Sequence, residues 1–231
     1  MGASPSRAAL VTGGSSGIGL AIARVLAEEG FALTLVSRTQ EKVEAAAAEL
    51  GAHAIAADLS SPDGCEPVVP GHVDRWGRLD LLVNSAGIGI GGRVEDIEIK
   101  HAGLQIAVNL GATFIVTRAA IPHLRETHGL IVNLASIAGT IPTPGLAMYG
   151  ATKAAVIQLT RSLNAELEGD GIRATAISPG FVDTPMASWS GLQPEEMIRP
   201  EDCAEIVRML LRLSPQARIP NVIVQRLGAE V

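Results

Sequence analysis

The stretch TGGSSGIG, from Thr12 to Gly19, lies between an apolar run at 8–11 and an apolar-periodic stretch at 20–29. This pattern predicts a strand before the glycines and a helix after them. A turn without bulky side chains lets backbone N–H groups approach a phosphate, and the following helix points its positive dipole end at the anion. Many glycine-rich turns bind nothing, but the placement of this one favours binding of a nucleotide phosphate.

Outward from this turn, short apolar runs alternate with longer helical patterns. The predicted strands cover 8–11, 32–36, 54–56, 79–83, 130–134, 173–177 and 221–224. Glycine or polar residues flank these runs, as is typical of parallel strands buried on both faces. The alternation predicts an α/β fold: a single doubly wound, Rossmann-type domain over 1–231 with a mostly parallel sheet of about seven strands.

Four longer helices are predicted between the strands, over 39–50, 97–124, 148–169 and 200–213. Thr39 suits the N-cap of the first, Gly169 the end of the third and Pro200 the first turn of the last. The second is expected to end near Pro122. Because prolines interrupt 67–70, a short or broken helix is expected there.

Composition narrows the functional classes. The 231 residues are 47% hydrophobic and carry a net charge of −6, which argues against a nucleic-acid-binding protein, since such proteins usually present a basic face. Cys65 and Cys203 are far apart, so no metal site is predicted. We expect no signal peptide and no apolar run of membrane-spanning length, which indicates a soluble, cytoplasmic chain without a membrane partner.

Residues that follow the predicted strands indicate the ligand. Ser37 and Arg38 follow the second strand, where an arginine suits a 2′-phosphate and an acidic residue would repel one. NADP(H) is therefore favoured and NAD(H) remains possible; the alternative is a solvated surface arginine. Asp58 is expected to bind the adenine amino group or to cap a turn. Asn84, in VNSAG, begins a small-residue turn beside the cofactor or merely forms that turn.

A second set of residues points to chemistry. Tyr149 and Lys153 are four apart on a predicted helix and therefore share a face. An ammonium group there stabilises the phenolate and lowers the pKa of the tyrosine toward the working range of an acid–base catalyst. Ser136 follows the fifth strand and either donates a hydrogen bond to a substrate carbonyl or forms a turn. Asn109 either braces the lysine through a water or satisfies a local kink.

These elements occur together in a fixed order: TGGSSGIG, the NSAG turn, Asn109, Ser136, Tyr149-x-x-x-Lys153 and the turn Pro179-Gly180. In this combination the chain resembles the short-chain dehydrogenase/reductase family over roughly 8–213. Ser85 stands where the family usually has a second asparagine. The C-terminal RIPNVIVQRLGAEV also departs from the common family pattern.

The resemblance implies roles for these residues. Tyr149 is the general acid in reduction and the general base in oxidation, Lys153 lowers the tyrosine pKa and holds the nicotinamide ribose, and Ser136 orients the carbonyl. Asn109 supports a proton relay. The implied cofactor-binding residues are Gly13, Ser15, Ser16, Gly17, Ile18, Gly19, Ser37, Arg38, Asp58, Leu59, Asn84, Ala86, Gly87, Tyr149, Lys153, Pro179, Gly180, Val182 and Thr184.

The expected function is NADP(H)-dependent hydride transfer between nicotinamide and a small carbonyl or alcohol substrate. Two alternatives are a 3-oxoacyl-carrier-protein reductase and a non-catalytic dinucleotide-binding regulator. The segment 185–199 is expected to form an apolar lid over the substrate, or else an ordinary surface helix. Its apolar residues are Met186, Trp189, Leu192 and Met197. Alanine-rich faces at 102–120 and 151–166 suit helix packing in a homodimer or homotetramer.

Overall fold

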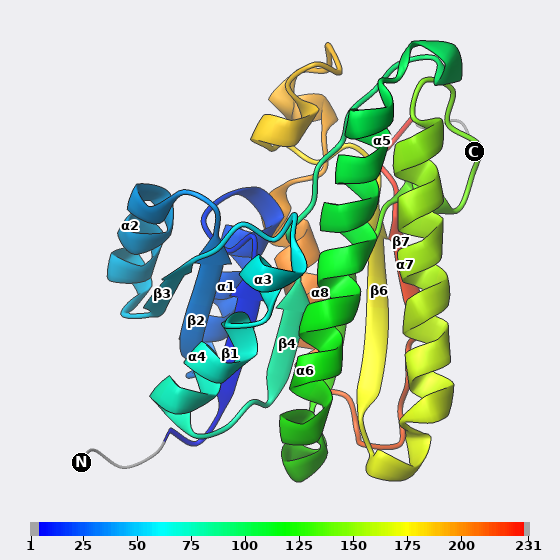
Figure 1. Cartoon of the computed structure of the whole chain (residues 1–231). Helices are drawn as coiled ribbons and strands as arrows, with labels where there is room; N and C mark the ends of the chain where they lie inside the picture. Colours follow the sequence, from blue (N-terminus) through cyan, green and yellow to red (C-terminus); the bar gives the residue numbers. More distant parts are fainter. Residues whose placement is uncertain (1–4, 229–231) are drawn as a thin grey trace.

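The computed structural model describes residues 5–228, which build a seven-stranded parallel sheet with helices on both faces (Figure 1). The strand order is β3-β2-β1-β4-β5-β6-β7, so the direction of winding reverses between β1 and β4. The strands are β1 (Ala8–Thr12), β2 (Ala32–Ser37), β3 (His53–Ala56), β4 (Leu81–Asn84), β5 (Leu130–Leu134), β6 (Arg173–Pro179) and β7 (Asn221–Val224). The predicted doubly wound fold is confirmed, and every pairing in this sheet is parallel.

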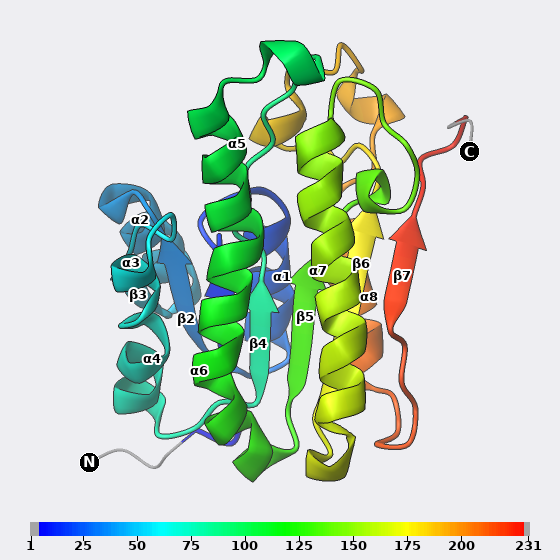
Figure 2. The ribbon, with the colours of Figure 1, turned by 45° about the vertical axis from the view of Figure 1, so that its right-hand side comes forward.

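Helices cover the two faces of the sheet in separate groups. One face carries α1 (Gly17–Glu28), α2 (Gln40–Leu50) and α8 (Pro200–Leu211). The other carries α3 (Pro62–Cys65), α4 (Val68–Trp76), α5 (Ile99–Gln105), α6 (Ala112–Thr127) and α7 (Ala147–Glu166). Figure 2 shows α6 and α7 in front of the sheet and α1 and α8 behind it. Short helical turns lie at Val94–Asp96, Ile137–Gly139, Glu168–Asp170, Pro185–Ala187 and Pro194–Glu196.

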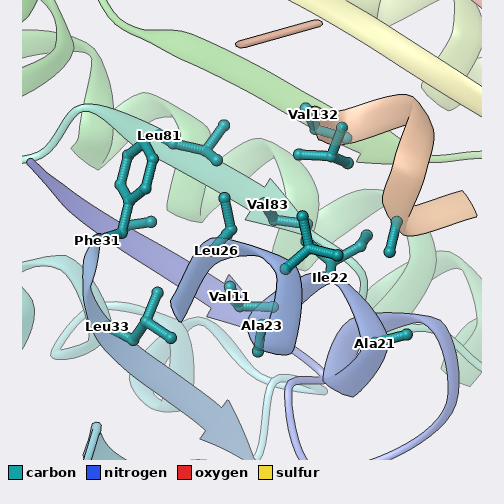
Figure 3. Packing of buried hydrophobic residues seen from close by; sticks show 14 of the residues in the cluster. Val11, Ala21, Ile22, Ala23, Leu26, Phe31, Leu33, Leu81, Val83 and Val132 are labelled. Atoms are coloured by element: carbon teal, nitrogen blue, oxygen red, sulfur yellow. The ribbon is translucent and has the colours of Figure 1, made fainter. Parts of the chain in front are cut away.

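The core beneath α1 shows why a chain with so few aromatic residues packs well. Ile22 and Leu26 of α1 are fully buried and lie against the sheet (Figure 3). Val11, Val83 and Val132, from three neighbouring strands, form the opposing surface. Burial of one such aliphatic side chain contributes about 1.5–3 kcal/mol, so this layer fixes the start of α1 firmly against β1 and β4.

Several helix boundaries differ from the predictions. The helix expected over 97–124 begins at Ile99 and continues to Thr127, with Pro122 inside it. Fully buried Leu124 in the following turn offsets part of the proline penalty of about 3 kcal/mol. Gly169 does not end α7, which ends at Glu166 with Leu167 as its C-cap. The left-handed Gly171, with φ 70°, closes the short turn Glu168–Asp170 that follows. Thr39 occupies the N-cap of α2, but its side chain makes no capping hydrogen bond.

Other boundary predictions hold. The helix expected before Trp76 is broken into α3 and α4: Pro67 is the N-cap of α4, and Pro70 lies in its first turn. Pro200 stands in the first turn of α8.

A continuous helix of 29 residues, Ile99–Thr127, is long and apolar enough by composition to cross a membrane. The expectation that no segment has this property is therefore wrong. Its middle section, Ile106–Gly111, is a π-helical turn that joins α5 to α6. In the structure this helix lies against the sheet and packs through fully buried Val116, Ala120 and Leu124, so its apolar side serves the protein core (Figure 2).

A buried polar chain ties α4 to β2. The Trp76 indole donates to Thr34 Oγ1 at 3.0 Å, and Thr34 Oγ1 lies 2.8 Å from His72 Nδ1. His72 Nε2 lies 3.0 Å from the Arg78 carbonyl, which only accepts, so Nε2 carries the proton. His72 is fully buried, and burial lowers its pKa from 6.5 to about 4.

This histidine predicts acid sensitivity of the fold. Between pH 6.5 and 4, His72 is protonated in the unfolded chain but stays neutral in the native chain. The free energy of unfolding therefore falls as the pH falls through this window. In urea unfolding, the native protein should lose about 2 kcal/mol more than the His72→Gln variant between pH 7 and pH 5. His101→Gln, a change at a histidine on the surface of α5, should behave like the native protein. Equal pH dependence of the native and His72→Gln proteins contradicts this account.

Candidate active site

A cleft of about 410 Å³ opens at the carboxyl edge of the sheet. Figure 2 shows the arrowheads of β4, β6 and β7 directed toward this end, with the gold segment after β6 beyond them. The cleft brings together many predicted residues: Gly13, Ser16, Gly17, Ile18, Gly19, Ala86, Gly87, Ser136, Tyr149, Lys153, Pro179, Gly180, Val182 and Thr184. The predicted residues that do not line it are Ser15, Ser37, Arg38, Asp58, Leu59, Asn84 and Asn109.

The glycine-rich turn forms one end of the cleft. A Cβ on Gly13 would lie 2.8 Å from the Ala86 nitrogen, and a Cβ on Gly19 would clash with the Gly13 carbonyl. Helix α1 begins at Gly17, and the side chain of its N-cap, Ser16, makes no capping hydrogen bond. The helix N-terminus therefore faces the cleft with backbone donors close to the surface, which is the arrangement that binds phosphate groups.

Thr12 is a residue that the sequence analysis did not single out by role. Its Oγ1 accepts hydrogen bonds from the Ser85 and Ala86 nitrogens at 3.1 and 3.2 Å. It thereby fixes the turn after β4 against the turn after β1. The only sequence signal was its position as the first residue of TGGSSGIG, directly before the glycines; in the structure it is the last residue of β1.

The predicted adenosine-binding residues lie beside the cleft, at the ends of β2 and β3. Arg38 is exposed, and Ser37 donates to the Thr39 carbonyl at 3.3 Å. Asp58 Oδ1 accepts from the Ser60 nitrogen at 3.0 Å; this bond, chiefly, and the Arg38 charge hold the pKa of Asp58 below its usual value. Asp58 thus does cap a turn, while Leu59 is buried in the core and presents only its backbone.

Asn84 faces the interior and not the cleft. Its amide donates to Asn133 Oδ1 at 2.9 Å and to Thr117 Oγ1 at 3.0 Å. Asn133 in turn donates to Thr160 Oγ1 at 2.9 Å. This buried network joins β4 and β5 to α6 and α7, so the Asn84 side chain holds the strand ends in register, and only its backbone adjoins the turn.

Ser136, Tyr149 and Lys153 meet at the centre of the cleft. Lys153 is buried, its Nζ donates to the Leu134 carbonyl at 2.7 Å, and it lies 5.7 Å from the centre of the Tyr149 ring. Burial lowers the pKa of Lys153 to about 8. Ser136 Oγ accepts from the Ala138 nitrogen at 3.2 Å.

The pKa of Tyr149 departs from the sequence-based expectation. Burial raises it above its usual value, and the Ser136 hydroxyl acts in the opposite direction with a smaller effect. The predicted lowering of the Tyr149 pKa by Lys153 is not found in the protein without cofactor, where burial has the largest effect. Tyr149 therefore carries its proton at neutral pH.

Asn109 and Gln105 hold the backbone of the segment after β4, which forms one wall of the cleft. Asn109 accepts from the Ile88 nitrogen at 2.8 Å and donates to the Ile88 carbonyl at 2.9 Å. One turn earlier, Gln105 accepts from the Ile90 nitrogen at 3.1 Å. Gln105 was missed by sequence reasoning, although its spacing of four residues from Asn109 places both on one helix face.

The hydrogen bonds of Asn109 also connect to the backbone of Tyr149. The Asn109 amide donates to Thr152 Oγ1 at 3.0 Å, and Thr152 donates to the Tyr149 carbonyl at 2.7 Å. A Cβ on Gly87 would lie 3.3 Å from Asn109 Oδ1 and 3.4 Å from Lys153 Nζ. Asn109 thus joins the post-β4 wall to α7 from a π-helical turn, a feature frequent at functional sites.

The segment 185–199 contains two short helical turns and no longer helix. Of its apolar residues, Met186 and Trp189 line the cleft. Leu192 does not line it, and Met197 lines a separate hollow near the C-terminal end of the described chain. The predicted apolar lid is thus reduced to the first half of the segment.

Comparison with known proteins identifies the family of the chain. The family profile described as short chain dehydrogenase matches residues 7–194. The chain belongs to this family. As a short-chain dehydrogenase it is an oxidoreductase, and the resemblance inferred from its motifs is confirmed.

Similar proteins include both sequence relatives and solved structures. An oxidoreductase of Staphylococcus epidermidis, described as uncharacterized, is 34% identical over 222 residues, 95% of this chain and 96% of that protein. An alcohol dehydrogenase from the archaeon Thermococcus sibiricus, complexed with 5-hydroxy-NADP, matches with TM-score 0.90 and 30% identity over 97% of this chain and 98% of that one. A 3-ketoacyl-(acyl-carrier-protein) reductase from Brucella melitensis, complexed with NADH, gives TM-score 0.89 and 29% identity over 96% of each chain.

Proposed function

We propose that this short-chain dehydrogenase is an NADP(H)-dependent carbonyl reductase, which interconverts a small ketone or aldehyde and its alcohol. The observation that carries the proposal is the convergence of Ser136, Tyr149 and Lys153 on the cleft that also contains the glycine-rich turn. A hydroxyl donor, a proton donor and a buried ammonium group thus adjoin a phosphate-binding helix end.

The residues present fit a nicotinamide dinucleotide. The turn is packed so closely at Gly13 and Gly19 that a side chain at either position would collide with backbone atoms. Such a turn is suited to a pyrophosphate. Arg38 is exposed after β2 and has the charge and planar donors that suit a 2′-phosphate. The solved neighbours contain an NADP derivative in one case and NADH in the other, so the preference for NADP(H) rests on Arg38.

The chain's own residues handle the carbonyl oxygen and its proton. When bound, the reduced nicotinamide supplies the hydride that the carbonyl carbon accepts. The Ser136 hydroxyl donates a hydrogen bond to the carbonyl oxygen, and Tyr149 transfers its phenolic proton to that oxygen, which completes the alcohol. The Lys153 ammonium stabilises the phenolate left behind, and a proton from solvent restores the phenol. Burial keeps the Tyr149 phenol protonated at neutral pH, so it holds a proton before the transfer.

A 3-oxoacyl-carrier-protein reductase is the second candidate, and the similarity to the Brucella melitensis enzyme favours it. Carrier proteins are acidic and need a basic docking surface. In 183–202, which contains the lid, five residues are acidic: Asp183, Glu195, Glu196, Glu201 and Asp202. Its one basic residue, Arg199, is paired with Asp202 at 2.6 Å. This charge pattern disfavours a carrier-protein partner.

The experiment that tests the proposal measures NADPH oxidation with a panel of free aldehydes, ketones and diketones and with an acyl carrier-protein substrate. Turnover of free carbonyl compounds supports the proposed function. Turnover of the carrier-linked substrate alone supports the second candidate. NADPH binding without turnover of any substrate supports a non-catalytic regulator on the same fold.

We further infer that the protein assembles into a homodimer or homotetramer through α5 and α6. Ile99, Ile106 and Phe114 are exposed there by 87%, 46% and 52%. Exposed apolar side chains on a long helix are typical of a self-association surface. Light scattering at micromolar concentration should give a multiple of the chain mass for the native protein. The Phe114→Glu variant should give a lower mass, and a monomeric native protein overturns the inference.

A further inference from the structure

The part of the cleft beyond Tyr149 has a distinct chemical character. Leu146, Met186 and Trp189 line it, together with Gly89 and Thr143. The only ionisable side chains anywhere in the described cleft are Tyr149 and Lys153, and Lys153 is already bonded to a backbone carbonyl. The one cation that lines the described cleft is the buried Lys153 ammonium, which is bonded to the Leu134 carbonyl and adjoins Tyr149. A carboxylate or phosphate in the apolar part of the cleft would lose its hydration without a cation of its own, at a large cost in free energy.

The space next to the tyrosine ring is narrow. A Cβ on Gly89 would lie 3.6 Å from Tyr149 Cε2 and 3.7 Å from Met186 Sδ. The backbone at Gly89 and the Met186 side chain therefore approach each other beside the ring. Both distances are ordinary van der Waals contacts, so the gap bounded by Gly89, Tyr149 and Met186 holds a methyl-sized group without a clash, and the flexible thioether of Met186 can adapt to it.

An aromatic pair forms the outer wall. Phe181 and Trp189 pack edge to face, with ring centroids 5.8 Å apart and an interplanar angle of 74°. Trp189 is 59% exposed although it lines the cleft. A half-exposed indole on the wall of an apolar cleft offers a large, rigid surface that an apolar ligand would cover.

The loop that carries Trp189 is anchored at its base. Val182 pairs with Ile198 in a parallel bridge. The Asp183 nitrogen donates to the Ile198 carbonyl at 2.9 Å, and the Ile198 nitrogen donates to the Phe181 carbonyl at 3.0 Å. These bonds join the two ends of the loop that carries Trp189, and Phe181, the aromatic partner of Trp189, belongs to the joined base.

We propose that the site accepts an uncharged carbonyl compound with an aromatic or similarly bulky apolar group, and that Trp189 selects this group. The inference rests on the proposed function and specifies its substrate class. The bulky group lies against the indole, and the small group or the aldehyde hydrogen lies between Gly89 and Met186. Carboxylate-bearing carbonyl compounds are disfavoured because no cation other than the buried Lys153 lines the described cleft.

The test compares three aldehydes with the full chain and NADPH: benzaldehyde, para-carboxybenzaldehyde and propanal. We expect kcat/KM for benzaldehyde to exceed that for its carboxylate analogue by about 10-fold or more. Trp189→Ala should lower kcat/KM for benzaldehyde about 10-fold and change that for propanal less than about twofold. Trp189→Phe should retain most of the benzaldehyde activity. Met209→Ala, a change at an apolar residue on α8 that does not line the cleft, is the matched control.

A binding readout keeps this proposal separate from the proposed function. The chain has two tryptophans, so ligand-dependent quenching is assigned by comparing the native protein with Trp189→Phe. With oxidised NADP⁺ present, acetophenone should quench the fluorescence of the native protein and have little effect on Trp189→Phe. Absence of turnover with all three aldehydes contradicts the proposed function. In that case the quenching experiment alone shows whether an aromatic carbonyl compound binds against Trp189. Equal turnover of the charged and neutral aldehydes, equal losses for benzaldehyde and propanal in Trp189→Ala, or no Trp189-dependent quenching overturns the inference.

Discussion

Replacing Tyr149 by phenylalanine should lower kcat for carbonyl reduction by about 1,000-fold, because removal of the phenolic proton leaves the developing alkoxide without its acid. The ring remains in place, so the packing around Ser136 and Lys153 is preserved. The dissociation constant for NADPH should change less than about threefold, since the lost hydroxyl acts on the substrate oxygen in the proposed mechanism. Steady-state kinetics and a fluorescence titration of NADPH measure the two quantities.

A spectroscopic control identifies the group directly. Tyr149 is the only tyrosine in the chain, so ultraviolet absorbance of the phenolate reports one residue. In the protein without cofactor, the phenolate should form at a pH above the ordinary tyrosine value, because burial disfavours the charged form. The signal should be absent from Tyr149→Phe. Retention of full activity by that variant would falsify the assignment of Tyr149 as the acid.

Reversing the charge at Arg38 should change the cofactor preference. In Arg38→Asp the dissociation constant for NADPH should rise about 100-fold, because a charge-assisted contact with the 2′-phosphate is lost and a repulsive carboxylate replaces it. Affinity for NADH should stay within about threefold of the native value, since NADH has no phosphate at that position. Fluorescence titration with both dinucleotides measures this ratio.

Lys42→Asp provides the matched control for this variant. Lys42 is an exposed cation on α2, four residues from Arg38, so its reversal alters the surface charge by the same amount. It should leave both affinities nearly unchanged at physiological salt. Unaltered NADPH affinity in Arg38→Asp shows instead that Arg38 is a solvated surface residue.

The sheet was predictable because its five inner strands, β1, β2, β4, β5 and β6, are mostly buried and read as apolar runs between breakers. The boundaries shift where tertiary pairing extends a strand: β6 reaches Pro179, which pairs with Val224 of β7. The helix over Ile99–Thr127 shows the opposite limit. Its π-helical turn and its passage through Pro122 depend on packing against the sheet, which no local pattern records.

At the site, the sequence indicated residue types and the structure placed them. Cleft-lining Ser136, Tyr149 and Lys153 came from motif spacing, and their catalytic roles stay predictions. Gln105 was missed because its partner is the backbone of Ile90, fifteen residues earlier in the chain. The direction of the Tyr149 pKa was missed for a related reason: spacing reveals a nearby lysine, whereas burial, which has the larger effect, appears only in the folded chain.

The central claim is that hydride transfer to a free carbonyl compound takes place in this cleft. The most direct measurement uses NADPH that carries deuterium at the transferable position of the nicotinamide, with benzaldehyde as substrate and Tyr149→Phe as control. Mass spectrometry of the product should show one deuterium on the carbinol carbon of benzyl alcohol, formed in step with NADPH consumption and nearly absent with the variant. Undeuterated alcohol, or equal deuterium transfer by Tyr149→Phe, contradicts the account.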